Sequence, residues 1–224
     1  MLILDVMKVR HLIVPYIPFV QCKQMLIVSI AGALIAGLYG IIHDQITYTI
    51  SPEYFTKLKF YQFDYVDYGL PNRAFVVFIG FLATWWVGFI SAWIISRIAF
   101  TYWRPEERYR KCIKYFSIVF ASGFTGGLVG YVLGRTHSSD YSYWGNLCRN
   151  LNISDIPSFV SVALIHSSGY LGGIVGLVIC VILLVREKIT HNKSELVNPI
   201  YAAEYSITLT NSKLTGWVAS PPRY

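Results

Sequence analysis

Three of the five histidines stand at the same spacing from a glycine in an apolar stretch. His43 and His137 each follow a glycine by three residues, and His166 precedes one by three. Residues three apart share a helix face, so each imidazole is predicted to continue the glycine face of its helix. His43 and His166 each lie 20 residues from the basic residue at the far end of their stretch, and His137 lies 23. At about 1.5 Å per residue, the three side chains are predicted to share one depth, near the outer boundary of the membrane.

These residue types are typical metal ligands. Imidazole nitrogens and a carboxylate bind zinc and related transition metals, and three histidines with an open position suit catalytic zinc. One hypothesis is therefore a site at the outer membrane face with a transition metal such as zinc as cofactor. Its candidate ligands are His43, Asp44, Glu53, His137 and His166. The other hypothesis is that these histidines bond to loop backbone and hold the first outer loop on the bundle, and the sequence leaves both open.

No motif assigns a reaction. The H-E-x-x-H, P-loop and G-x-S-x-G patterns do not occur, so no catalytic residue is predicted and the question whether the protein is an enzyme stays open. No apolar stretch carries a carboxylate at mid-depth, which argues against a proton-coupled transporter. The predicted role is structural or partner-binding. The alternatives are a metal-dependent membrane enzyme acting at the outer leaflet and a small transporter or channel subunit.

The elements that position these residues follow from the placement of charge. Only 14% of the 224 residues are charged, against about 25% in soluble proteins. Four stretches lack Asp, Glu, Lys and Arg, and each is long enough to cross about 30 Å of hydrocarbon as a helix. The predicted fold is an all-α membrane four-helix bundle with spans at about 25–42, 74–96, 115–134 and 157–185. Ser51-Pro52-Glu53 predicts a short helix in the first outer loop, with Ser51 as its N-cap.

Lysine and arginine predict the orientation. Of 19 such residues, 14 lie in segment 1–24, between the second and third spans, or in tail 186–224. The remaining five lie in the other two loops. By the positive-inside rule both termini are cytoplasmic, which makes 25–185 the transmembrane domain of a multi-pass protein. The net charge of +7 is then explained by the lysine and arginine residues that keep the basic segments on the cytoplasmic side. The predicted partners are the lipid bilayer and either a membrane protein complex or further copies of the chain, and not nucleic acid.

A shared glycine pattern predicts helix packing. The third and fourth spans both read G-aromatic-x-G-G-aliphatic-V-G. Small residues on one helix face allow close backbone approach, which drives packing in lipid. The predicted contact residues are Gly126, Gly127, Gly130, Gly169, Gly172, Gly173 and Gly176. The first span has small residues at the same spacings, so these three helices are predicted to pack tightly together. The second span, which holds three tryptophans, is predicted to be the bulkier and more lipid-facing member of the bundle.

The segment His43–Thr56, which reads HDQITYTISPEYFT, resembles the hallmark of a family of uncharacterised bacterial four-span membrane proteins. The pattern of that family is close to HDQ-V-[TS]-Y-x-[IV]-S-PEYFT, followed by a K-F-x-Q-F element, here residues 59–63. His166 before Tyr170-Leu171-Gly172-Gly173 is also similar to the fourth span of that family. The resemblance implies a bacterial inner-membrane protein. It implies no activity.

Overall fold

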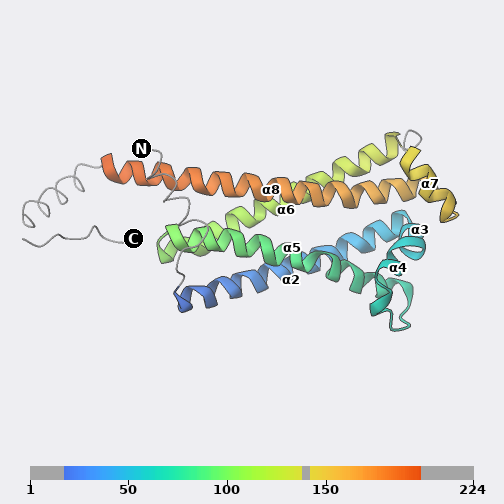
Figure 1. The fold of residues 1–224 in the computed structure, drawn as a ribbon, viewed down its shortest axis with the longest axis horizontal. Coiled ribbons are helices and arrows are strands. Elements are labelled where there is room, and N and C mark those ends of the chain that lie inside the picture. Colours follow the sequence, from blue (N-terminus) through green and yellow to red (C-terminus); the bar gives the residue numbers. More distant parts are fainter. Residues whose placement is uncertain (1–17, 138–141, 198–224) are drawn as a thin grey trace, which may run out of the picture. The chain divides into compact units, whose positions relative to one another are not determined.

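The computed structural model describes residues 18–137 and 142–197 (Figure 1). Within these ranges every element is helical. Four long helices dominate: α2 (Phe19–Ile50), α5 (Asn72–Tyr102), α6 (Pro105–His137) and α8 (Ile156–Val197). All four are long and apolar enough to cross a membrane. The predicted all-α fold with four spans is therefore confirmed.

The helices extend beyond the charge-free stretches. α2 begins at Phe19, so residues 19–24 of the predicted cytoplasmic segment belong to the first long helix. At its other end α2 continues through His43 and Asp44 to Ile50. α8 likewise continues into the predicted tail as far as Val197. Residues up to Cys180 form one compact unit, which contains the site described below, and residues 181–224 form a second.

The loop after α2 is a chain of short helical turns. Its elements are α3 (Pro52–Tyr54), the π-helical turn η1 (Phe55–Lys59), α4 (Phe60–Gln62) and the 3₁₀ turn η2 (Asp64–Val66). The Ser51 hydroxyl accepts a bond of 3.3 Å from the Tyr54 amide, which confirms the predicted N-cap. Tyr54 and Phe55 are buried against Phe159 of α8 and against Cys148 of α7 (Ser142–Asn150). The loop therefore packs on the start of α8.

α5 packs closely on α2, side by side in Figure 1. A Cβ atom added at Gly32 would lie 2.8 Å from the carbonyl oxygen of Gly88, and a Cβ atom added at Gly40 or Gly80 would overlap the carbonyl oxygen of the other glycine. The Thr84 hydroxyl donates a bond of 2.8 Å across the contact, to the carbonyl of α2 residue 36. The prediction that the second span is the more lipid-facing member is wrong, because a larger share of its apolar window is buried than in α6 or α8. Its residues 80, 84, 88 and 92 form a small-residue face of their own, and its tryptophans at 85 and 86 lie on the exposed side.

α6 and α8 approach each other along the predicted glycines, and the approach is closest at four of them. Added Cβ atoms at Gly126 and Gly130 would overlap α8 carbonyl groups. At Gly172 and Gly176 they would lie 2.5 Å and 2.7 Å from atoms of Ser122. A Cβ atom added at Gly173 would meet no heavy atom within 4 Å, whereas the backbone nitrogen of Gly173 lies 3.7 Å from a Cβ added at Gly123, so its packing role stays a prediction. The two remaining predicted residues, Gly127 and Gly169, make only ordinary contacts, the nearest atoms being 3.8 Å and 3.7 Å away.

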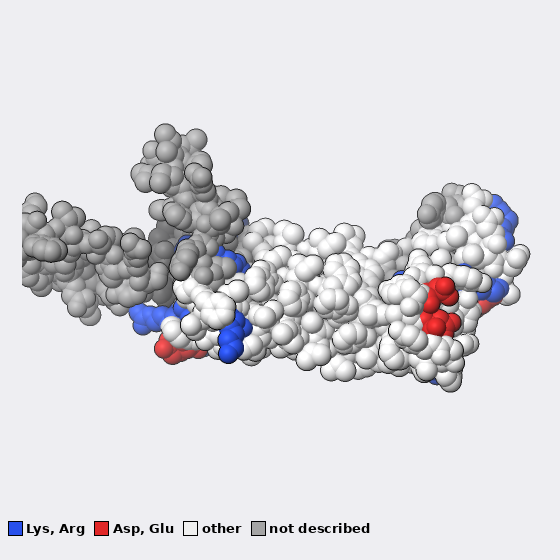
Figure 2. Space-filling model, turned by 60° about the horizontal axis from the view of Figure 1, so that its bottom comes forward, with Lys and Arg blue, Asp and Glu red and all other residues white. Residues whose placement is uncertain are grey.

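The outer surface of the helices is apolar. On the face drawn in Figure 2, a broad band carries no charged side chain, and the coloured residues lie on either side of it. Large apolar side chains such as Leu38, Leu128 and Ile174 are more than half exposed. Such exposure on a long helix is expected next to lipid, so this surface fits a multi-pass membrane protein in contact with the bilayer.

Candidate functional site

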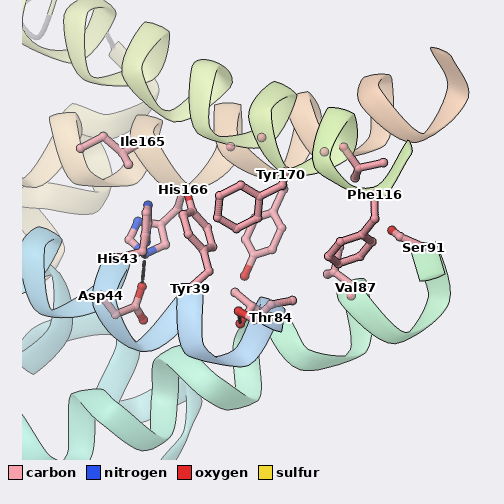
Figure 3. Close-up of a pocket in the computed structure, with 17 residues that line it drawn as sticks. Tyr39, His43, Asp44, Thr84, Val87, Ser91, Phe116, Ile165, His166 and Tyr170 are labelled. Carbon is pink, nitrogen blue, oxygen red and sulfur yellow. Dashed lines mark hydrogen bonds and ion pairs between the residues drawn. The ribbon is translucent and has the colours of Figure 1, made fainter. Parts of the chain in front are cut away.

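His43 and Asp44 of α2 meet His166 of α8, as Figure 3 shows. One oxygen of Asp44, Oδ1, lies 3.0 Å from His43 Nδ1 and 3.1 Å from His166 Nε2. The two imidazole rings are 4.9 Å apart between centroids and stand at 82° to each other. One ligand atom from each of the three side chains lies within 4.8 Å of the others. The structure thus brings together three of the five candidate ligands.

This group is buried. Asp44 is 3% exposed and His166 is 8% exposed. The second carboxylate oxygen, Asp44 Oδ2, is also buried and accepts no hydrogen bond from the described part of the chain. A buried carboxylate is costly unless its charge is compensated and its oxygens are bonded. The site therefore holds one acceptor more than its described donors satisfy.

The hydrogen bond between His166 Nδ1 and the Val162 carbonyl decides which ring nitrogen carries the proton. Nδ1 lies 2.8 Å from the carbonyl oxygen of Val162. Because a carbonyl can only accept, we assign the proton to Nδ1. In a neutral ring, Nε2 then presents a lone pair to the carboxylate oxygen of Asp44. Two acceptors at 3.1 Å repel each other, so a proton or a metal cation must lie between them.

Aromatic rings enclose the histidines. Tyr54 stacks on His166 with 5.1 Å between centroids and 28° between the planes. The Tyr39 ring lies next to the His43 ring, with 5.5 Å between their centroids. Burial raises the pKa of Tyr54 and lowers the pKa of Lys59, whose ammonium lies 5.9 Å from the Tyr54 ring. The loop between α2 and α5 therefore supplies an apolar cover to the group.

A cavity of about 110 Å³ adjoins the histidines and Asp44. All four long helices contribute to its wall, and the side chains of Phe116, Phe120 and Val87 make most of it apolar. In Figure 3 the imidazoles and the carboxylate lie at one end, and Phe116, Val87 and Ser91 at the other. A ligand bound to the group would therefore extend into an apolar space within the bundle.

Glu53 does not join this group. Its carboxylate accepts bonds from the amides of Asp155 at 2.9 Å and Ser154 at 3.0 Å, and it pairs with Lys57 at 2.7 Å. These contacts, the Asp155 amide first and Lys57 next, lower the pKa of Glu53 to about 2. Lys57 also donates to the carbonyl of Asn152. Glu53 thus fastens the loop between α2 and α5 to the residues that directly precede α8.

His137 is the last residue of α6, and its side chain lies outside the described side chains. The backbone register does not support the predicted common depth. Gly130 packs against Leu164, and His137 follows Gly130 by seven residues, about 10 Å further along the helix and away from the level of His166. Its role as a ligand stays a prediction.

Two tyrosines at the site were not predicted from the sequence. Tyr39 precedes His43 by four residues, and Tyr170 follows His166 by four. This spacing places each tyrosine one helical turn from its histidine on the same face, on the side away from the loop between α2 and α5, and both line the cavity. The Tyr170 hydroxyl donates a bond of 3.1 Å to the carbonyl of Ala83. The four-residue spacing was the signal that could have identified them.

No family model, no curated protein and no solved structure matches this chain.

Proposed function

We propose that this is an integral membrane protein that binds a transition-metal ion, with zinc as the leading candidate, through His43 Nδ1, His166 Nε2 and the Asp44 carboxylate. The observation that carries the proposal is the arrangement at His166. One ring nitrogen is committed to the Val162 carbonyl and the other faces a buried carboxylate oxygen at 3.1 Å. A metal ion removes that repulsion and compensates the buried charge at once.

The donor set fits zinc. Two imidazoles and one carboxylate form a common three-residue ligand set of catalytic zinc sites, which leave a fourth position open. Histidines that bind a metal almost always donate their other ring N–H to a carbonyl or carboxylate, which fixes the ring. The bond from His166 Nδ1 to Val162 has this form. The unbonded Asp44 Oδ2 offers a further ligand atom.

The position of the group supports chemistry at the outer leaflet. With the basic segments in the cytoplasm, the site lies near the outer boundary of a bacterial inner membrane, as the resemblance to the four-span family also implies. A metal held by these residues would adjoin the cavity, whose wall is mostly apolar. Such a metal can polarise a carbonyl or activate a bound water. We therefore place a metal-dependent membrane enzyme before a passive scaffold.

A structural role is the second candidate, and the loop contacts favour it. Tyr54 stacks on His166, and Glu53 bonds to the amides at the start of α8. In this alternative a protonated His166 pairs with Asp44 and no metal is needed. The pair then serves to hold the first outer loop and α2 against α8.

Metal analysis separates the two candidates. The full-length protein is purified in detergent without added metal, equilibrated with zinc and freed of excess, and its metal content is measured by inductively coupled plasma mass spectrometry. We expect about one zinc per chain in the wild type and loss of that zinc in both His43→Ala and His166→Ala. His191→Ala, which removes a histidine from the C-terminal unit, is the control and should keep its zinc. A wild type that retains no zinc would reject the metal proposal.

A further inference from the structure

A second cavity continues the first. It has a volume of about 320 Å³ and shares Val87, Ser91, Tyr170 and Gly173 with the cavity at the histidines. Its other lining residues are Trp86 and Ile90 of α5 and Ile174 and Leu177 of α8. Because the two spaces share four lining residues, they adjoin each other, and together they extend from the His–Asp group to the space between α5 and α8.

The joined space opens toward lipid. Trp86 and Ile90, at its far end, are each 47% exposed, and Ile174 is 62% exposed. These residues lie in helices that are long and apolar enough to span a membrane. Outside this mouth a membrane offers hydrocarbon and not water. An apolar cavity of about 150 Å³ is enough to bind benzene, so the joined space accommodates part of an alkyl chain.

The joined space also has a direction. Along α8 its lining residues run from His166 through Gly169 and Gly173 to Leu177, and Gly173 is at the middle of the spanning segment Ile156–Thr190. The polar end thus lies near the membrane boundary, and the apolar end lies near the membrane centre. A lipid of the same leaflet has its headgroup and chain in this order.

Charge complementarity defines the head of the ligand. A divalent metal bound by two neutral imidazoles and the Asp44 carboxylate would carry a net charge of +1 beside a mostly apolar cavity. Burial of an uncompensated charge is costly, so an anionic ligand at the open position is favoured. A carboxylate meets this need and is itself a common zinc ligand.

We infer that the site binds a long-chain carboxylate taken from the bilayer, with its carboxylate on the metal and its alkyl chain in the joined cavities between α5 and α8. This inference rests on the proposed metal site. It names the class of substrate or product on which a metal-dependent reaction here would act.

Gly173 provides the test. It lines both cavities, and a Cβ atom there meets nothing within 4 Å. The ring in Gly173→Phe therefore enters the junction of the two cavities without a clash at the backbone. Leu171→Phe is the matched control, because Leu171 is on the same helix, is 62% exposed and lines neither cavity.

The probe is a diazirine-bearing palmitic acid, crosslinked by light to the zinc-loaded protein in lipid nanodiscs and mapped by mass spectrometry. We expect labelling on the α5 and α8 residues of the second cavity. Gly173→Phe should lose most of it while keeping its zinc, and Leu171→Phe should label like the wild type. Hexadecanol should compete at least about tenfold less well than palmitate, since it lacks the charge-assisted contact.

The outcomes distinguish this inference from the metal proposal. Zinc in Gly173→Phe together with undiminished labelling would overturn the inference and leave the metal site standing. Equal labelling of zinc-loaded and chelated wild type would overturn the contact between carboxylate and metal. A wild type that retains no zinc would reject the proposed function itself.

Discussion

His166 Nε2 lies 3.1 Å from Asp44 Oδ1, although 122 residues separate the two in the chain. Both side chains are buried, and the contact joins α8 to α2 at a point where the neighbouring aromatic residues exclude water. The second oxygen of Asp44 has no partner among the described residues. This pair therefore holds the buried negative charge of the candidate site, and a proton or a metal cation must lie between its two facing atoms.

Removal of the carboxylate is expected to destabilise the fold even without metal. Asp44→Ala leaves His43 and His166 without their shared acceptor, and breaking one partner of a buried ionic contact costs about 3 kcal/mol or more. Unfolding by sodium dodecyl sulfate in mixed micelles with a chelator present measures this loss. Asp64→Ala, in the exposed turn η2, should change the free energy of unfolding by less than about 0.5 kcal/mol. Equal stability of the two variants would contradict the role of Asp44.

The ring of Tyr54, and not its hydroxyl, is expected to support metal binding. Tyr54 stacks on His166 at 5.1 Å, so Tyr54→Leu frees the imidazole to turn, whereas Tyr54→Phe keeps the stack. Loss of support around a ligand typically weakens metal affinity about tenfold or more. Competition with a chelating dye should show this weakening in the leucine variant alone. Weakening of the same size in Tyr54→Phe would transfer the role to the hydroxyl group.

Alanine at Gly88 is expected to disturb the contact between α2 and α5. The added methyl would overlap the carbonyl group of Gly32, and such overpacking costs about 1–3 kcal/mol. Gly145→Ala in α7 is the control, since the nearest atom to its added methyl is the end of the Arg149 side chain at 3.9 Å. Because alanine favours helix over glycine, we expect that variant to be neutral or more stable by about 0.5–1 kcal/mol. Thermal unfolding in detergent compares the two, and an unchanged Gly88→Ala would mean that the helices can separate at no cost.

Glu53 acts as a latch for the loop between α2 and α5 through its bonds to the Ser154 and Asp155 amides. This latch is expected to weaken in acid. Its contacts lower its pKa from 4.5 to about 2. A lowered pKa means that the stabilisation is complete above the unfolded value of 4.5 and is lost as the pH falls from there toward 2. Glu53→Gln should therefore be less stable than the wild type at pH 7, by about 1–2 kcal/mol, and the difference should shrink below pH 4.5.

Unfolding measured from pH 7 to pH 3 checks this dependence. Glu107→Gln is the control, because Glu107 pairs with Arg110 at 3.3 Å on an exposed surface. An exposed ion pair contributes little to stability, so that variant should follow the wild type throughout. A difference between Glu53→Gln and the wild type that stays constant down to pH 3 would contradict the latch.

Much of the fold is readable from the sequence because its causes are local. The absence of charge over about 20 residues requires a helix in hydrocarbon, whatever the neighbours are. The start of α3 at Ser51 and of α8 after Asp155 also depends on side chains that bond within one turn, at 3.3 Å to Tyr54 and 3.1 Å to Ser158. For the same reason the common depth of His43 and His166 could be counted along the chain.

The pairing of helices and the membership of the site were decided only by the tertiary structure. Glycine faces on different helices are interchangeable in sequence, so nothing in the chain shows that α2 selects α5, or that Gly173 lines a cavity while Gly172 packs on Ser122. Counting residues gives height along a helix but not the direction in which a side chain points relative to another helix. Asp44 and His166 meet, and Glu53 turns to the Ser154 and Asp155 amides before α8, because the rotation of each helix is set by how all its side chains pack. That rotation is a property of the whole bundle and not of any one segment.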